Sequence, residues 1–383
     1  MKHKTLNLLI YFIIIFSTII GNEWINAENK IIKNYSFNNN HTTYKIFSDS
    51  TYYIVSNVFE KKYYKKYSMI ISIDENGELQ KKLELKNTNN QILSGIKLKN
   101  GGFLFVGYSQ PTSEDWNKIY VVKTDKKLNI IWEKIYSSTN YDNKGYSIAE
   151  LNENEYYILG NTQASKNNAL ILKIDSNGNE KWFSYLPNLN CTFATHMIIN
   201  KKEEIIVAGQ YLKQLFVSKI NKNGEILWNY NYLDDNHSHR LYEIKNTSDG
   251  GIILVGNTTQ NTQKKKDILI IKLSNDGREE WIEVLGNESS EVAYDIEEAN
   301  SNYIITGFAL KDKKGELYHS FIIKTDSLGK QLERIDLNDL PSNKLYDLNI
   351  ERNKKLNTIS YIGTGDITKN DQSRILFIKF EEK

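Results

Sequence analysis

The chain has 383 residues, of which 40% are hydrophobic and 25% are charged, with three prolines and one cysteine. This composition excludes a collagen-like chain, a disulfide-stabilised scaffold and a highly charged disordered tail. The 49 basic and 47 acidic residues leave a net charge of +2, so the charge gives no reason to expect binding to nucleic acid or to an anionic membrane surface.

Residues 1–27 have the features of a secretory signal peptide. Lys2 and Lys4 form a basic start, residues 8–20 are almost entirely apolar, and a polar stretch ends at Ala27. The apolar run is shorter than the roughly 20 residues that a membrane span needs. We therefore expect a secreted or cell-envelope protein whose mature domain, residues 28–383, has no membrane span. Retention of the segment as an N-terminal anchor is the alternative.

Beyond this segment the chain repeats about every 50 residues, and each unit contains four strand-like segments. The first reads Tyr-x-Ile, the second ends in Gly, the third carries a Lys near its end, and the fourth carries a Trp after a tight turn. The second segments occupy residues 52–56, 103–107, 156–160, 205–209, 252–256, 303–307 and 359–363. Their β-branched and aromatic residues favour strands, and the Asn-Gly and Asp-Gly turns favour hairpins. Seven such units predict an all-β, seven-bladed β-propeller with four antiparallel strands per blade.

The last unit lacks its fourth strand, because only three residues follow Phe380. The N-terminal residues 31–35 match the register of residues 132–136 and precede the first Tyr-x-Ile segment. Pairing of residues 31–37 with the last unit would remove the open edges of the array. We therefore predict that an N-terminal strand closes the ring.

The clearest unit, residues 249–281, resembles the bacterial secreted β-propeller repeat proteins, whose units read DGGyivaG…liKld.nG…W. The resemblance covers about residues 30–383 and implies the fold and export, but little biochemistry, because the functions in this family are diverse. The Asp-x-x-Gly…Trp element also resembles the quinone-dependent dehydrogenase propellers. Those have eight blades, an Ala at the start of the motif and a Thr before the Gly, so we expect neither a quinone nor another cofactor.

The tryptophans divide into a repeated column and one outlier. Trp132, Trp182, Trp228 and Trp281 recur at the blade spacing, which is typical of rings that fill the wedge between neighbouring sheets. The repeated Lys is interpreted as a side chain lying along the neighbouring blade. Trp116 lies outside the column, in a loop between second and third strands. We take it as the candidate binding residue, which could stack on a glycan or anchor a protein partner; local loop packing is the alternative.

Asp235, His237 and His239 form the most metal-like cluster, with Cys191 and His196 in the matching loop one unit earlier. A His-x-His pair in a strand places both rings on one face. No further nitrogen or sulfur ligand is evident nearby, so a polar loop is the simpler interpretation and we expect no metal. No acid–base pair, Ser-His-Asp signature or phosphate-binding loop can be picked out, so no catalytic residue is assigned.

Long, dissimilar loops connect successive units and the second and third strands, and they share one face of the predicted ring. Such loops on a rigid frame are where recognition is expected. We favour an exported, monomeric, non-enzymatic propeller that binds an unknown protein or glycan through this face. One alternative is a hydrolase or polysaccharide-cleaving enzyme with its site in the central funnel, and another is a structural envelope assembly protein. Converging carboxylates or histidines in the funnel would favour the enzyme, whereas an apolar plug would favour binding or scaffolding.

Overall fold

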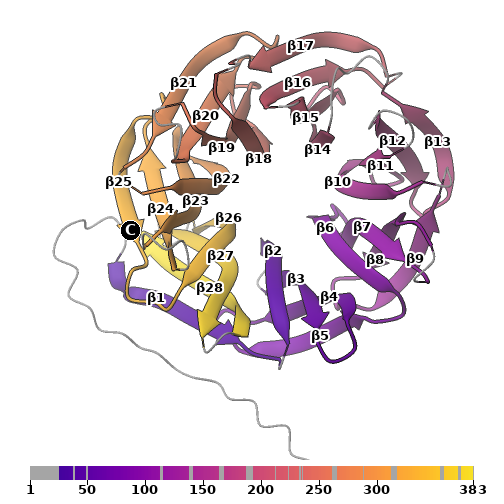
Figure 1. The fold of residues 1–383 in the computed structure, drawn as a ribbon, viewed down its shortest axis with the longest axis horizontal. Coiled ribbons are helices and arrows are strands. Elements are labelled where there is room, and N and C mark those ends of the chain that lie inside the picture. The colour runs from indigo at the N-terminus through magenta and orange to yellow at the C-terminus, as the bar shows by residue number, and fades with distance from the viewer. Residues whose placement is uncertain are drawn as a thin grey trace, which may run out of the picture.

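The computed structural model describes residues 26–37, 39–48, 51–112, 115–137, 141–163, 168–186, 193–211, 213–222, 224–232, 234, 236–260, 265–287, 289–311, 317–353, 358–369 and 372–382. In this part of the chain, 28 strands form seven four-stranded sheets. The sheets are arranged as blades around a central opening (Figure 1). The predicted seven-bladed β-propeller is therefore confirmed.

Within each blade, strands that follow one another in sequence pair antiparallel, from the innermost strand to the outermost. Blade 1 contains β2 (Asn40–Ser48), β3 (Tyr52–Glu60), β4 (Lys65–Ile73) and β5 (Leu79–Leu85); blade 2 contains β6 (Asn89–Lys97), β7 (Phe103–Gln110), β8 (Lys118–Thr124) and β9 (Ile130–Tyr136). Blade 3 contains β10 (Asn143–Asn152), β11 (Glu155–Thr162), β12 (Asn168–Asp175) and β13 (Glu180–Tyr185); blade 4 contains β14 (Phe193–Ile199), β15 (Ile205–Tyr211), β16 (Gln214–Ile220) and β17 (Ile226–Tyr232).

The remaining blades follow the same order. Blade 5 contains β18 (His239–Asn246), β19 (Ile252–Thr258), β20 (Asp267–Leu273) and β21 (Glu279–Leu285); blade 6 contains β22 (Glu291–Ala299), β23 (Asn302–Leu310), β24 (Tyr318–Thr325) and β25 (Gln331–Asp336). Blade 7 contains β26 (Asn343–Asn353), β27 (Thr358–Lys369), β28 (Gln372–Glu382) and, as its outermost strand, β1 (Asn26–Tyr35).

Strand β1 closes the ring in the register that the repeat predicts. Ile31 pairs with Lys379, as Trp132 pairs with the repeated Lys123 in blade 2. The outermost strands also make the same contact to the next blade: the Tyr35 hydroxyl donates a hydrogen bond to Gly77 O at 2.7 Å, and the Tyr136 hydroxyl donates to Gly178 O at 2.7 Å. The N-terminal strand is thus equivalent to the fourth strand of the other blades.

The apolar core lies between the blades, with one buried cluster at each of the seven interfaces between neighbouring sheets. The second and third strands are covered on both faces; every residue of β19 and β20 is buried. This explains their continuous apolar runs. A strand with one face in solvent alternates apolar and polar residues, whereas a strand buried on both faces is apolar throughout. Each fully buried Ile or Phe stabilises the fold by roughly 1.5–3 kcal/mol.

The repeated tryptophans lie half-buried at the outer ends of these interfaces. The Trp228 Nε1 group donates to Asn275 O of the next blade at 3.2 Å, and Lys219 Nζ donates to the same carbonyl at 2.7 Å. Both side chains therefore join neighbouring blades, as the repeat pattern indicates.

The predicted signal peptide, residues 1–27, lies outside the described residues except for Asn26 and Ala27, which begin β1. Among the residues that the structure describes, no helix is long and apolar enough to cross a membrane.

Candidate functional site: a layered funnel at the centre of the ring

A break in strand pairing occurs at the same place in all seven innermost strands. One residue is skipped where each of these strands pairs with the second strand of its blade. The skipped residues are Tyr44, Leu93, Tyr146, Thr195, Tyr242, Tyr294 and Tyr346. A bulge of this kind leaves the extra residue unpaired and re-aims the side chains beside it.

The seven skipped residues, which we call the collar, line a central cavity of about 450 Å³. We call the residues that follow the collar residues the floor: Lys45, Ser94, Ser147, His196, Glu243, Asp295 and Asp347. All floor residues except Asp295 line the same cavity. The cavity includes Gln210, at the end of a second strand, and Arg240, at the start of an innermost strand. It therefore opens toward the face that carries the long loops.

The collar is rich in aromatic rings that contact one another across blades. The ring centroids of Tyr242 and Tyr294 lie 4.3 Å apart, and those of Tyr294 and Tyr346 lie 4.9 Å apart. On another side, Tyr146 meets Phe193 edge to face at 4.7 Å. Burial raises the pKa of Tyr146 to about 12, so this phenol is neutral at physiological pH. The collar is thus an uncharged, half-buried aromatic wall.

The floor contains an ion-pair network centred on Lys45. Lys45 Nζ lies 2.7 Å from Asp347 Oδ1 and 3.6 Å from Glu243 Oε2, although these residues belong to blades 1, 7 and 5. Burial lowers the pKa of Lys45, but the carboxylate of Asp347 has the opposite effect and the net direction is upward. Burial likewise tends to raise the pKa of Glu243, and the positive charge of Lys45 brings it below its usual range. Lys45 therefore remains an ammonium group.

A second lysine extends the network. Lys245 Nζ lies 2.5 Å from Glu297 Oε1 and 3.2 Å from Asp295 Oδ1. The network therefore contains four carboxyl groups and two ammonium groups. Burial disfavours the excess negative charge, and it raises the pKa of Asp347 to about 8 in spite of the opposing effect of Lys45. Burial therefore favours the protonated form of Asp347, whereas its contact with Lys45 favours the ionised form.

Floor side chains also join neighbouring blades through backbone hydrogen bonds. Asp347 Oδ2 accepts from Ile46 N at 2.7 Å, and Asp295 Oδ2 accepts from Leu348 N at 2.9 Å. Ser147 Oγ receives the equivalent bond from the next blade, at 3.2 Å. An innermost strand has no further strand to pair with, so these side chains satisfy N–H groups at the edge of the sheet.

His196 is fully engaged at the floor. Its Nε2 lies 2.7 Å from Tyr242 O, and its Nδ1 lies 2.7 Å from Thr195 Oγ1. A carbonyl oxygen only accepts, so Nε2 carries the proton and Nδ1 accepts from the Thr195 hydroxyl. Burial lowers the pKa of His196, which keeps the ring neutral.

The carboxylates of Glu243, Asp295 and Asp347 offer oxygen atoms within 4.8 Å of one another. Such a set could bind a divalent cation. However, Lys45 and Lys245 already lie at ion-pair distance from these oxygens, so the charges that balance them belong to the protein. We assign no metal to this position.

The His cluster singled out from the sequence forms around a different carboxylate. His237 Nδ1 lies 2.6 Å from Asp234 Oδ2, and the buried His239 lies with Nε2 3.8 Å from the same oxygen. Asp235 and Cys191 lie outside the described residues. His196 belongs instead to the floor of the funnel.

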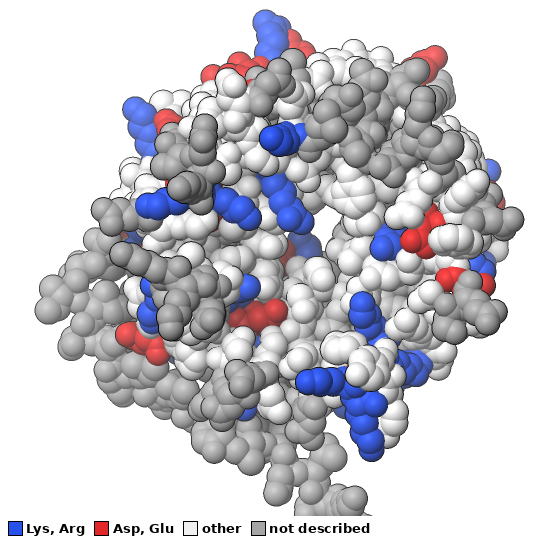
Figure 2. All heavy atoms as spheres, in the orientation of Figure 1, with Lys and Arg blue, Asp and Glu red and all other residues white. Residues whose placement is uncertain are grey.

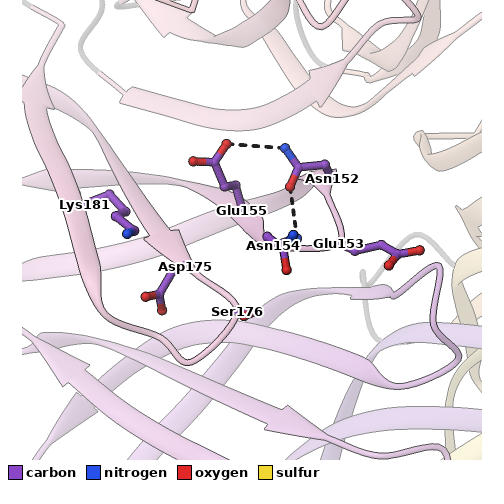
Figure 3. Close-up of a pocket in the computed structure, with 7 residues that line it drawn as sticks. All are labelled: Asn152, Glu153, Asn154, Glu155, Asp175, Ser176 and Lys181. Carbon is purple, nitrogen blue, oxygen red and sulfur yellow. Dashed lines mark hydrogen bonds between the residues drawn. The ribbon is translucent and has the colours of Figure 1, made fainter.

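Trp116 is 55% exposed in the loop between β7 and β8, and it does not line the central cavity. Its role as a binding residue remains a prediction. A separate hollow lies between hairpin turns of blade 3, where Asn152, Glu155 and Lys181 are among the lining residues (Figure 3). Side chains there bond within their own turn, as Asn152 Nδ2 does to Glu155 Oε2 at 3.3 Å, so this hollow is a surface of turn residues.

The floor was not predicted from the sequence, although its signal is present in the repeat. The floor residue is the middle position of the Tyr-x-Ile segment, and it is polar or charged in all seven blades. The funnel is not plugged by apolar side chains, since carboxylates and His196 converge in it. Carboxylates or histidines that converge in the funnel were expected of an enzyme, and the structure has them. These groups are paired with one another, however, and that pairing does not favour an enzyme.

Comparisons with known proteins establish the fold alone. No protein-family model and no curated protein matches this chain. Among solved structures, the polysaccharide lyase Uly1 is similar with a TM-score of 0.52 and 9% identity, covering 88% of this chain and 89% of that one. The β-propeller domain of the Trilobed protease from Pyrococcus furiosus has a TM-score of 0.49 and 13% identity, covering 91% and 96% of the two chains.

Proposed function

We propose that this chain is an exported binding protein that holds its ligand in the central funnel without chemically changing it. The observation that carries the proposal is the layering of the funnel: half-buried tyrosines form the wall, and the charged groups beneath them are already paired. A cavity of about 450 Å³ lies within the roughly 300–1,000 Å³ that is typical of small-molecule sites.

The state of the floor groups argues against catalysis. Both ring nitrogens of His196 have protein partners, and Lys45 is held as an ammonium group by Asp347 and Glu243. A general base needs a free lone pair within reach of the proton it removes. Neither of these side chains offers one in the arrangement described.

The collar supports binding. Five of its seven members are tyrosines, and all five are half-buried, so that part of each ring remains accessible. Aromatic rings held by a rigid frame provide a large contact area at little cost in conformational entropy. The seven sheets that surround the central opening form such a frame.

One observation favours the enzyme as a second candidate. Glu243 and Asp347 lie on either side of Lys45, and their pKa values are displaced in opposite directions. Two carboxyl groups whose pKa values are displaced apart are the arrangement that hydrolases use for acid–base chemistry. A hydrolase or polysaccharide-cleaving enzyme would place its substrate over these two groups.

The test is a glycan-binding screen of the mature chain, followed by calorimetry and product analysis on each binder. We expect a ligand that is recovered unchanged after prolonged incubation. Tyr242→Ala should weaken its binding at least tenfold. Tyr63→Ala should not, because it alters a 63% exposed tyrosine in the loop between β3 and β4 that does not line the cavity. Cleavage that Glu243→Gln abolishes would establish the enzyme instead. Binding that is indifferent to Tyr242→Ala would remove the funnel as the site.

A further inference from the structure

The mouth of the funnel carries an excess of positive charge. Two residues before each collar residue, the seven innermost strands place Thr42, Gln91, Lys144, Phe193, Arg240, Val292 and Lys344, a set that we call the rim. Three rim residues are cations and none is an anion. Figure 2 shows Lys and Arg side chains around the central opening of the ring, with Asp and Glu side chains also visible near it.

Aromatic rings support the rim cations. The Arg240 guanidinium lies 5.1 Å from the ring centroid of Tyr242, and Arg240 itself lines the cavity. Lys344 Nζ lies 3.8 Å from the ring centroid of Tyr318, and Lys144 Nζ lies 4.6 Å from that of Tyr108. Cation–π contacts of this kind orient a charge without neutralising it.

No rim cation forms an ion pair within 4 Å among the described residues. This distinguishes the rim from the floor, where both lysines are paired. The acidic residue opposite Lys344 is Asp366, whose Oδ1 instead accepts hydrogen bonds from Thr43 N and Oγ1 at 2.9 Å. The rim thus carries three cations without ion-pair partners in the described part of the chain, and one of them, Arg240, lines the cavity.

The layers of the funnel also determine how a ligand could lie in it. A carboxylate at the rim would meet Arg240, whose planar fork binds carboxylates in a bidentate manner. A carboxylate at the floor would be repelled by Glu243, which lines the cavity. Hydroxyl groups suit the floor, because they can donate to the Glu243 carboxylate. The apolar faces of sugar rings can pack on the collar tyrosines.

We propose that the ligand is an acidic oligosaccharide whose carboxylates lie at the rim and whose hydroxyls reach the floor. This inference rests on the proposed binding function and specifies its ligand class. An acidic peptide would satisfy the rim but would leave the hydrogen-bonding groups of the floor without the hydroxyls that they suit.

The experiment is calorimetry of the full-length mature chain with tetragalacturonate, tetraglucuronate and their uncharged methyl esters, with octaglutamate as the acidic peptide. We expect at least one acid to bind tenfold or more tightly than its ester. Arg240→Gln should lower the affinity for that acid about tenfold and remove most of the preference over the ester. Lys62→Gln, which removes an exposed charge in the loop between β3 and β4, is the matched control, and thermal melting confirms folding of each variant.

The outcomes separate the two proposals. Equal affinity for acid and ester, with Tyr242→Ala weakening both, would overturn the acidic class and leave the funnel as a binding site. Stronger binding of octaglutamate than of any sugar would also overturn the acidic-oligosaccharide class. The funnel would then be a binding site for an acidic peptide. If none of these probes bound, the acidic-oligosaccharide inference would fail, and the wider glycan screen would decide the binding function by itself.

Discussion

Asp347 shows how burial alters the pKa of a single floor residue. It lies 2% exposed between Lys45 and the Ile46 backbone amide, within a cluster that holds more carboxyls than ammonium groups. Burial raises its pKa to about 8, whereas an Asp in an unfolded chain ionises near pH 3.9. Between these values the native state holds a proton that the unfolded state has released, so this group stabilises the fold at low pH and loses that contribution as the pH rises toward 8.

This linkage gives a pH-dependent prediction for Asp347→Asn. The variant lacks the titration, so the unfolding free energy of the parent chain, measured relative to the variant, should fall by about 1.3 kcal/mol per pH unit between pH 5 and pH 7. Urea denaturation at pH 5, 6 and 7 measures the difference. Other titrating groups that the substitution leaves unchanged contribute equally to both proteins, so their contributions cancel when the two unfolding free energies are subtracted. A difference that does not vary with pH would show that Asp347 is ionised throughout.

At the scale of the element, each outermost strand closes over the turn of the next blade. Gly277 occupies such a turn with φ of +81°, and a Cβ added there would lie 2.5 Å from the Trp228 ring. Gly250 has a similar φ of +87°, but nothing lies within 4 Å of its added Cβ. Substitution of Gly250 therefore tests backbone strain alone, whereas substitution of Gly277 tests strain together with contact to the Trp228 ring.

Gly277→Ala and Gly250→Ala should differ in stability for this reason. Both substitutions place a side chain at positive φ, which costs about 1 kcal/mol. Gly277→Ala must also displace the Trp228 ring, and overpacking adds about 1–3 kcal/mol. Chemical denaturation of both variants measures the two losses. Equal losses would mean that Trp228 does not pack on this turn.

The role of β1 as the closing strand can be tested by comparing a substitution in β1 with the equivalent substitution in β9. Tyr35→Phe and Tyr136→Phe each remove one hydroxyl that donates at 2.7 Å to a turn carbonyl of the next blade. Each change should lower the free energy of unfolding by about 1 kcal/mol, the usual net value of such a hydrogen bond. The two denaturation curves should shift by similar amounts. A silent Tyr35→Phe beside a destabilising Tyr136→Phe would show that β1 does not close blade 7 in solution.

At the scale of the whole molecule, the repeat predicts the ring but not the chemistry of its centre. Strand type, blade number and the closing strand follow from local signals, namely the Gly-ended strands, the turns and the missing fourth strand. The floor does not follow from them, because a bulge at the collar position turns the middle residue of Tyr-x-Ile toward the channel. Lys45 and Glu243 meet at 3.6 Å although nearly 200 residues separate them, and sequence spacing contains no information about that contact.

The most direct test of the proposed site is a crystal structure of this chain grown with the tightest-binding acidic tetrasaccharide. The layered funnel predicts sugar density against the collar tyrosines, with a carboxylate paired to Arg240 and hydroxyls directed at Glu243. Sugar bound at Trp116 or at the turns of blade 3, with none in the funnel, would contradict the assignment.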